Sequence, residues 1–311
     1  MAFTGFNVVK PNTTAHTSSI KVLWWLHCIA FILHFALVLS AIISITDVGT
    51  VHVPVFWPIA QWNYTACAIK GYDAGVLVCP SDTMPEKVGD VNLGAVLIIS
   101  QTITCTFHAI QLIQTQQHDS IYITWSVIKG IKVWHWLEYI LTAPLVAHVI
   151  LYLSGMLDLP TQIIVYGSQS TLMLIGMLQD ILRDYVVTNP ISATSLRVVK
   201  FIIISSFVVG FYNVFSIWFP AFYLLFINSL RSETDPPAFV KWIVLIEFML
   251  YTSFGIAQFV FFLPMVVSSN SRSLTYFSFI FEEITFTVLS FASKAVLATA
   301  FSMCLVYNKC M

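Results

Sequence analysis

Seven long runs of apolar residues divide this chain and limit the folds open to it. A bilayer core of about 30 Å requires roughly 20 apolar residues in a helix, which each run supplies. Only 9% of the residues are charged, against roughly 25% in soluble proteins. So few charged residues cannot form the polar surface that a soluble protein would need over all seven apolar runs. We therefore predict an all-α membrane protein, a bundle of seven transmembrane helices. The predicted spans are residues 22–46, 91–115, 133–156, 162–187, 198–229, 239–267 and 281–307.

One connection is much longer than the others. Residues 47–90, between the first two spans, hold short Val-rich and aromatic stretches between Pro and Gly residues, which predicts a small β element outside the bilayer. Cys67 and Cys79 in this loop can form a disulfide if the loop faces an oxidising compartment, and two free thiols are the alternative. The other connections are short, so we expect a single domain over residues 1–311, with residues 1–21 as a polar segment before the first helix.

The positions of Lys and Arg predict the orientation. If the N-terminus is cytoplasmic, eight cationic residues lie in cytoplasmic segments and five lie outside. The positive-inside rule therefore predicts a cytoplasmic N-terminus and an external C-terminus, with the sequon Asn63-Tyr64-Thr65 and both loop cysteines outside. The eight are Lys10, Lys21, Lys129, Lys132, Arg183, Arg197, Lys200 and Arg272, and the five are Lys70, Lys87, Arg231, Lys241 and Lys309.

Charge and cysteine spacing exclude two classes of partner. The net charge of −1 and the absence of a basic stripe argue against nucleic-acid binding. The six cysteines include no CxxC pair and no Cys/His cluster at zinc spacing, so we expect no metal site.

Lys294 lies in the middle of the seventh run, with apolar or small residues on both sides. A lysine at mid-bilayer costs roughly 2.5–3.5 kcal/mol on insertion scales and usually marks a functional site. A structural ion pair is the plain explanation. The alternative is chemical modification, because a neutral amine in a dry pocket condenses with an aldehyde to form a Schiff base. The 25 Phe, 12 Tyr and 9 Trp residues are enough to line a cavity for a hydrocarbon.

A charged nitrogen in this position requires a carboxylate nearby. Glu138 lies in the third span, Glu247 in the sixth, and Glu282 and Glu283 at the start of the seventh. The third and seventh spans run in the same direction, and at 1.5 Å per residue Glu138 lies about 8 Å and Lys294 about 15–18 Å along them. The lysine side chain leans back toward its helix start, so the two can meet. Glu283 is about 16 Å away along the helix, which is too far, and Glu247 is expected at the membrane interface.

Four segments resemble the heliorhodopsin family. The seventh span, from Glu283-Ile284-Thr285 through Leu289-Ser290 to Lys294, is similar to the retinal-binding helix of that family. The third span, with Trp136-Leu137-Glu138-Tyr139, looks like the family's counterion helix. Gly176-Met177-Leu178 and the stretch Ser253 to Gln258 also look similar to family patterns, so the resemblance covers all seven helices and the first external loop.

The resemblance implies that Lys294 carries all-trans retinal on a protonated Schiff base and that Glu138 is the counterion. His34 and His108 match histidines that hold water on the cytoplasmic side of the chromophore. His27 and His148 have no counterpart, and their roles stay open. The other residues that the resemblance places at the retinal site are Ser290, Thr142, Gln169 and Thr104.

Some positions depart from the family pattern. Thr142 and Pro144 stand where the family's third helix is rich in Ser, and Ala298-Thr299 stands in place of Ala-Trp. Gln169 and Gln258 each replace an Asn. These differences concern the colour and the photocycle rate rather than the attachment of the chromophore.

The resemblance implies a light-sensing photoreceptor rather than an enzyme. It also implies that the protein forms a homodimer in the lipid membrane and acts on a signalling partner that is unknown. Light-driven or light-gated proton transport is the alternative, because the spans hold more ionisable groups than a sensor requires. These groups are Glu247, Glu282, Glu283, His27 and His148. A third class, an intramembrane enzyme or small-molecule transporter without a chromophore, predicts a colourless protein and has no catalytic motif in its favour.

Overall fold

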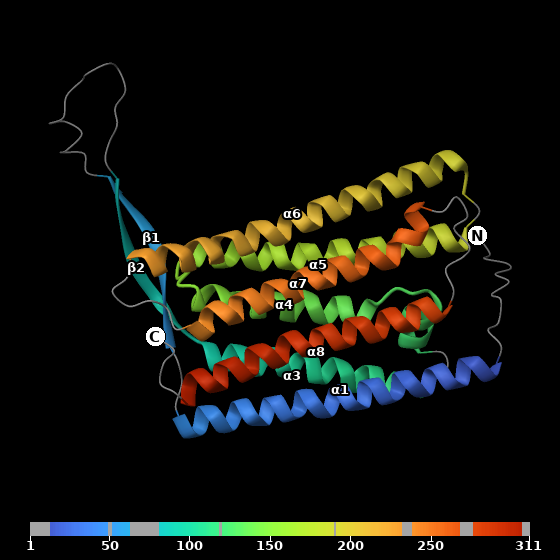
Figure 1. Cartoon of the computed structure of the whole chain (residues 1–311), viewed down its shortest axis with the longest axis horizontal. Coiled ribbons are helices and arrows are strands. Elements are labelled where there is room, and N and C mark those ends of the chain that lie inside the picture. Colours follow the sequence, from blue (N-terminus) through green and yellow to red (C-terminus); the bar gives the residue numbers. More distant parts are fainter. Residues whose placement is uncertain are drawn as a thin grey trace, which may run out of the picture.

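The computed structural model describes residues 13–48, 52–62, 81–117, 120–189, 191–231, 238–267 and 276–306. Over these residues the chain forms seven long α-helices, one short π-helix and one two-stranded sheet (Figure 1). The helices are α1 (Thr13–Val48), α3 (Leu93–Gln114), α4 (Val133–Leu153), α5 (Leu159–Thr188), α6 (Ala193–Arg231), α7 (Ala238–Val267) and α8 (Tyr276–Val306), the π-helix is η1 (Tyr122–Ile128), and the strands are β1 (His52–Trp62) and β2 (Ser81–Asn92).

The seven long helices form a closed ring. Each helix packs against the next along the chain, and α8 returns to α1. The helices run side by side, and the β1–β2 hairpin extends from one end of the bundle (Figure 1). Helix α1 begins at the end opposite the hairpin and α8 ends at the hairpin end, so the described chain crosses the bundle an odd number of times. This agrees with the predicted helical bundle.

Five of the helices, α1, α3, α4, α6 and α7, are long and apolar enough to cross a membrane. Helices α5 and α8 carry charged side chains that are buried inside the bundle, among them Asp180 and Lys294. Helix α6 shows the opposite pattern, because Phe201 and Phe219 on its outer surface are 71% and 70% exposed. Large exposed aromatic side chains on a long apolar helix are typical of a surface that faces lipid.

The helix boundaries differ from the predicted spans for local reasons. Helix α1 begins at Thr13, earlier than the predicted residue 22. Helix α5 begins at Leu159 rather than 162, because the Asp158 side chain caps it by accepting a hydrogen bond from the Thr161 backbone N–H at 3.0 Å. The connection between α3 and α4 contains η1, which the apolar runs do not predict and which packs against α3, α4 and α8.

The predicted β element between the first two spans is present. Strands β1 and β2 pair antiparallel from His52↔Asn92 to Trp62↔Ser81, with an irregularity between Val55 and Phe56. The Asn92 side chain then accepts from the Ala95 backbone N–H and caps α3, so the second strand leads directly into the next helix. Cys67, Cys79 and the sequon lie outside the described residues.

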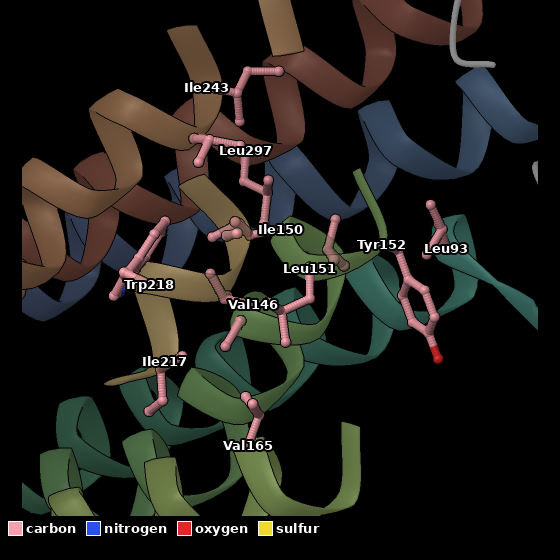
Figure 2. Packing of buried hydrophobic residues seen from close by; sticks show 14 of the residues in the cluster. Leu93, Val146, Ile150, Leu151, Tyr152, Val165, Ile217, Trp218, Ile243 and Leu297 are labelled. Carbon is pink, nitrogen blue, oxygen red and sulfur yellow. The ribbon is translucent and has the colours of Figure 1, made fainter. Parts of the chain in front are cut away.

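The largest apolar core includes Val53 and Val55 of β1 and so lies where the hairpin joins the bundle. Figure 2 shows how part of this core packs. Val53 of β1 packs there with Ile150 of α4, Trp218 of α6 and Leu297 of α8. Burying about 25 cal/mol per Å² of apolar surface in such a core stabilises the junction between the hairpin and the bundle. The buried ionisable residues are mostly found outside this core, in the part of the bundle nearer the start of α1.

Candidate functional site

Three helices meet at the side-chain nitrogen of Lys294, which is only 4% exposed. The Nζ atom donates to Glu138 Oε1 on α4, to Thr104 Oγ1 on α3 at 2.6 Å and to Ser290 Oγ on α8 at 3.0 Å. Thr104 Oγ1 in turn donates to the same Glu138 oxygen at 2.9 Å. The depth of the two residues along their helices predicted this ion pair, and the structure contains it.

The surroundings hold this nitrogen in place. The Tyr139 ring centroid lies 5.5 Å from Lys294 Nζ, and the Tyr139 hydroxyl donates to the Phe286 carbonyl at 3.1 Å. The Gln101 side-chain amide donates to the Lys294 carbonyl at 3.1 Å, which ties α3 to α8 at this level. Removing one partner of a buried ion pair costs about 3–5 kcal/mol, because the other charge is left uncompensated.

A cavity borders Lys294. Its empty space, including the open side, is about 880 Å³. Helices α4 to α8 form the walls, and most of the lining is apolar or aromatic. The lining residues are Trp136, Tyr139, Thr142, Ala143, Val146, Leu172, Met173, Ile175, Gly176, Gln179, Ser206, Phe207, Gly210, Phe211, Val214, Tyr251, Phe254, Gly255, Gln258, Phe286, Ser290, Ser293 and Lys294.

Two glycines set the shape of the cavity wall. A Cβ on Gly176 would overlap the Trp136 ring, and a Cβ on Gly255 would lie 3.1 Å from the Phe211 ring. Both aromatic rings can therefore lie directly against a neighbouring helix backbone. An amine at the wall of an apolar aromatic cavity, with a carboxylate in contact, fits a hydrocarbon carbonyl compound attached to Lys294.

The other residues assigned by the resemblance are divided between two regions. Thr142 lines the cavity, and its buried hydroxyl has no hydrogen-bond partner among the described residues. Gln169 is also buried but is not among the cavity-lining residues, so the structure does not bring it to the position that the sequence predicted. His34, His108 and Thr104 lie outside the cavity lining as well, although Thr104 contacts Lys294 directly.

Four buried histidines form a group that we call the histidine cluster: His27, His34, His108 and His135. His34 Nδ1 lies 2.8 Å from Gln101 Oε1, and the rings of His34 and His108 stack with centroids 5.5 Å apart. His27 Nδ1 lies 3.2 Å from His108 Nδ1. The two histidines that the resemblance singled out therefore lie together, and His27, which had no assigned role, lies with them.

His135 was missed in the sequence. Its Nε2 atom lies 3.0 Å from Glu283 Oε1, and its Nδ1 atom lies 3.9 Å from Glu138 Oε2. The Tyr122 hydroxyl of η1 donates to Glu283 Oε1 at 3.0 Å and lies 2.6 Å from His27 Nε2. His135 precedes Glu138 by three residues, and this spacing on one helix face is the signal that identifies it. Tyr122 lies in a connection, where no periodicity points to it.

Lys132 and Arg183, which the sequence analysis counts among the cytoplasmic cations, are not exposed to solvent. Both are buried with Asp180 and Glu282 in a group that we call the four-charge cluster. Lys132 Nζ lies 2.9 Å from Asp180 Oδ2 and 2.5 Å from Glu282 Oε1. Arg183 lies 2.8 Å from Glu282 Oε2 and 3.3 Å from Asp180 Oδ1. Without these two buried cations, six cationic residues lie in the predicted cytoplasmic segments and five lie outside.

The four-charge cluster contacts the cavity wall through Asp180. The indole N–H of Trp136 donates to Asp180 Oδ2 at 2.7 Å, and the Gln258 amide donates to Oδ1 at 3.1 Å. Both donors also line the cavity. On the other side, Arg183 donates to the carbonyl of Gly130 at 2.7 Å, where φ is 70° and favours glycine. The cluster thus connects the cavity wall to the turn before α4.

Glu247 was expected at the membrane interface, whereas the structure buries it inside the bundle. It is fully buried roughly 13 Å along α7, and the Ser293 hydroxyl donates to its Oε2 atom at 2.6 Å. Because Ser293 immediately precedes Lys294, a second carboxyl group lies close to the lysine-bearing segment. His148, by contrast, lies 2.7 Å from the Pro144 carbonyl within α4 and is not part of the histidine cluster.

Comparison with known proteins gives one family. The model of the heliorhodopsin family matches residues 23–304, from α1 to α8, and so includes Glu138 and Lys294. A search of curated proteins gave no significant match.

Proposed function

The chain belongs to the heliorhodopsin family, and we propose that it is a light sensor whose response to light serves signalling. The family binds retinal, and the apolar helices are those of an integral membrane protein. The observation that carries the proposal is the position of Lys294, which contacts Glu138 at the wall of an aromatic cavity. We expect no enzymatic activity and no nucleic-acid partner.

Bound retinal, which we propose to be the all-trans isomer joined to Lys294 Nζ as a Schiff base, would absorb visible light and change shape. Glu138 would balance the positive charge at Nζ, and Thr104 and Ser290 would orient that nitrogen through their hydroxyl groups. Trp136 and Phe254 would line the chromophore and exclude water from it. In this role the aromatic side chains would fix the shape of the bound chromophore and would not take part in the chemical steps.

The Lys294–Glu138 pair is the element that would convert light into a structural change. Moving Nζ away from the carboxylate separates opposite charges in a buried site, where their attraction is worth several kcal/mol. That energy can drive a proton from Nζ to Glu138 and then a rearrangement of the helices that carry them. The Gln101 side chain on α3 donates a hydrogen bond to the Lys294 carbonyl, so a shift of Lys294 would also move α3.

Several features of the assembly are part of the same proposal. The N-terminus would be cytoplasmic and the C-terminus external, and residues 1–311 would form one domain. Helix α1 begins and α8 ends at opposite ends of the bundle, which supports the placement of the two termini on opposite sides of the membrane. Two chains would associate through the first external loop in the lipid membrane, with a signalling partner still to be identified.

Proton transport is a second candidate, and Glu247 is the observation that favours it. This buried carboxyl group accepts a hydrogen bond from Ser293, next to Lys294 in the chain. Glu138 and Glu283 provide carboxylates from α4 and α8 on the side of the histidine cluster. Ionisable groups from different helices therefore approach the lysine-bearing segment, as a transport path would require.

The visible spectrum tests whether the chain is a retinal protein. The full-length protein, expressed with retinal, should be coloured, and the Lys294→Arg variant should be colourless because a guanidinium group does not form the Schiff base. Ser293→Ala is a matched control, since it changes the adjacent residue and keeps the amine. A colourless parent, or a variant as coloured as the parent, would contradict the proposal.

Electrical recording separates the two candidate functions. Light sensing without transport predicts no reproducible photocurrent in voltage-clamped cells that express the coloured protein. A light-evoked current that disappears in Glu138→Gln would establish transport and overturn the signalling proposal. A current that also disappears in Glu247→Gln would assign the second carboxyl group to the path.

A further inference from the structure

His135 lies between two buried carboxylates that belong to different helices. Its Nε2 atom is 3.0 Å from Glu283 Oε1 on α8, and its Nδ1 atom is 3.9 Å from Glu138 Oε2 on α4. All three side chains are nearly inaccessible, with exposed fractions of 1%, 3% and 0% for His135, Glu283 and Glu138. An imidazole between two carboxyl groups can accept a proton at one nitrogen and release one from the other.

On the Glu138 side of His135, the two facing atoms, His135 Nδ1 and Glu138 Oε2, make no hydrogen bond among the described residues. Both atoms are buried. A buried polar atom without a partner costs about 1–3 kcal/mol, so a structure that leaves two such atoms facing each other requires an explanation. Closing the 3.9 Å separation to hydrogen-bond distance needs a movement of only about 1 Å.

On the other side of His135, in contrast, the Glu283 carboxylate already makes hydrogen bonds. Glu283 Oε1 accepts from the Tyr122 hydroxyl at 3.0 Å, and that hydroxyl lies 2.6 Å from His27 Nε2. His135 Nε2 also lies 3.5 Å from the Thr287 hydroxyl. Tyr122 and His27 are both fully buried, so the groups around Glu283 can hold a proton inside the bundle.

We propose that His135 relays a proton from Glu138 to Glu283 after light activation. The relay rests on the proposed light reaction, in which the N–H bond at Lys294 Nζ breaks and an O–H bond forms on Glu138. Nζ contacts Glu138 Oε1, so the carboxyl group must turn to bring the O–H to the side of His135. That O–H bond then breaks as an N–H bond forms at His135 Nδ1. At the same time the Nε2–H bond breaks and an O–H bond forms on Glu283.

The relay conserves charge and needs no other reactant. Before the transfer Nζ is cationic, both glutamates are anionic and His135 is neutral with its proton on Nε2. After it Nζ is neutral, Glu138 is anionic again, Glu283 is a neutral acid and His135 is neutral with its proton on Nδ1. One positive charge has in effect moved from the Lys294 nitrogen to the carboxylate of Glu283, eleven residues earlier in α8. Return of the proton by the same route resets the protein.

Light-induced infrared difference spectroscopy on the full-length protein with retinal tests the relay. The parent should show the C=O signal of a newly protonated carboxylic acid, and Glu283→Gln should lose this signal. His135→Phe should lose it as well while the visible colour is retained. His135→Asn provides a second variant in case the phenylalanine variant fails to fold, and the same loss is expected. His148→Phe is the matched control, because it removes another histidine of α4 and should leave the signal unchanged.

The outcomes distinguish the relay from the proposed function beneath it. A coloured His135 variant that forms protonated Glu283 with the parent's amplitude and rate would overturn the relay alone. A parent signal that survives in Glu283→Gln would do the same, because the proton would then be held elsewhere. A colourless parent would overturn both the relay and the retinal-based function.

Discussion

The bundle holds two buried groups of ionisable side chains, and they differ in how completely their polar atoms are paired. In the four-charge cluster, Lys132 and Arg183 each contact both Asp180 and Glu282. In and around the histidine cluster, several buried atoms have no hydrogen-bond partner among the described residues. These atoms are His34 Nε2, His108 Nε2, His135 Nδ1 and Glu138 Oε2, whereas Arg183 Nε is the one such atom of the four-charge cluster.

This difference separates a fixed region from one that can change. Two cations and two carboxylates in mutual contact leave no net charge, and any displacement would break several ion pairs at once. The histidine cluster has free donors and acceptors, so a small movement can form new hydrogen bonds there without breaking many old ones. We therefore expect the four-charge cluster to hold the cavity wall while the groups around Glu138 rearrange.

The largest loss of stability should come from removing one charge of the four-charge cluster. Arg183→Gln leaves the Glu282 and Asp180 carboxylates with one cation between them, and it should lower the free energy of unfolding by about 3–5 kcal/mol. Thermal unfolding of the purified protein in detergent measures this. The control is Lys87→Gln, which removes an exposed pair with Asp90 on the hairpin (2.9 Å) and should cost only about 0–1 kcal/mol. Equal losses in the two variants would remove the distinction between the regions.

Trp136→Phe should have a smaller effect, because Trp136 contacts both the four-charge cluster and the cavity. The variant keeps an aromatic ring but loses the indole donor to Asp180, which still accepts from Lys132, Arg183 and Gln258. Loss of one hydrogen bond to a charged group should cost about 1.5–3 kcal/mol. The absorption maximum should shift as well, since Trp136 lines the cavity. A loss of stability with an unchanged spectrum would show that the cluster and the chromophore pocket are uncoupled.

The smallest loss of stability is expected in the histidine cluster. His34→Phe removes the contact with Gln101 Oε1 and keeps a ring next to His108, so it should cost about 0.5–1.5 kcal/mol. Its main effect should instead be a changed lifetime of the light-activated state, measured by time-resolved absorption. If His34→Phe lost as much stability as Arg183→Gln and left the lifetime unchanged, the histidine cluster would have a structural role only.

The sequence predicts the helices and the central ion pair well, because both depend on regularities along the chain. Apolar runs of bilayer length locate the spans, and the rise per residue places Glu138 and Lys294 at levels where they can meet. The β element follows in the same way from turn residues between short apolar stretches. These features are local or depend only on the direction of two helices.

The rest depends on how the helices pack around one another. Lys132 directly precedes one apolar run and Arg183 lies near the end of another, positions that solvent-exposed charges often occupy. Only the packing of α4, α5 and α8 brings them to Asp180 and Glu282. Glu247 lies near the start of its run, but the neighbouring helices bury it. Tyr122 reaches Glu283 from η1, which lies in a connection without any periodic signal.

The central claim is that the Lys294 nitrogen carries the chromophore, and peptide mass spectrometry tests it most directly. Chemical reduction of the coloured protein makes the linkage permanent, and digestion then isolates the α8 peptide that contains Lys294. We predict that this peptide carries the added mass of one retinyl group and that fragmentation assigns the group to Lys294. An unmodified Lys294 in protein that was coloured before reduction, or the added mass on another lysine, would contradict the account.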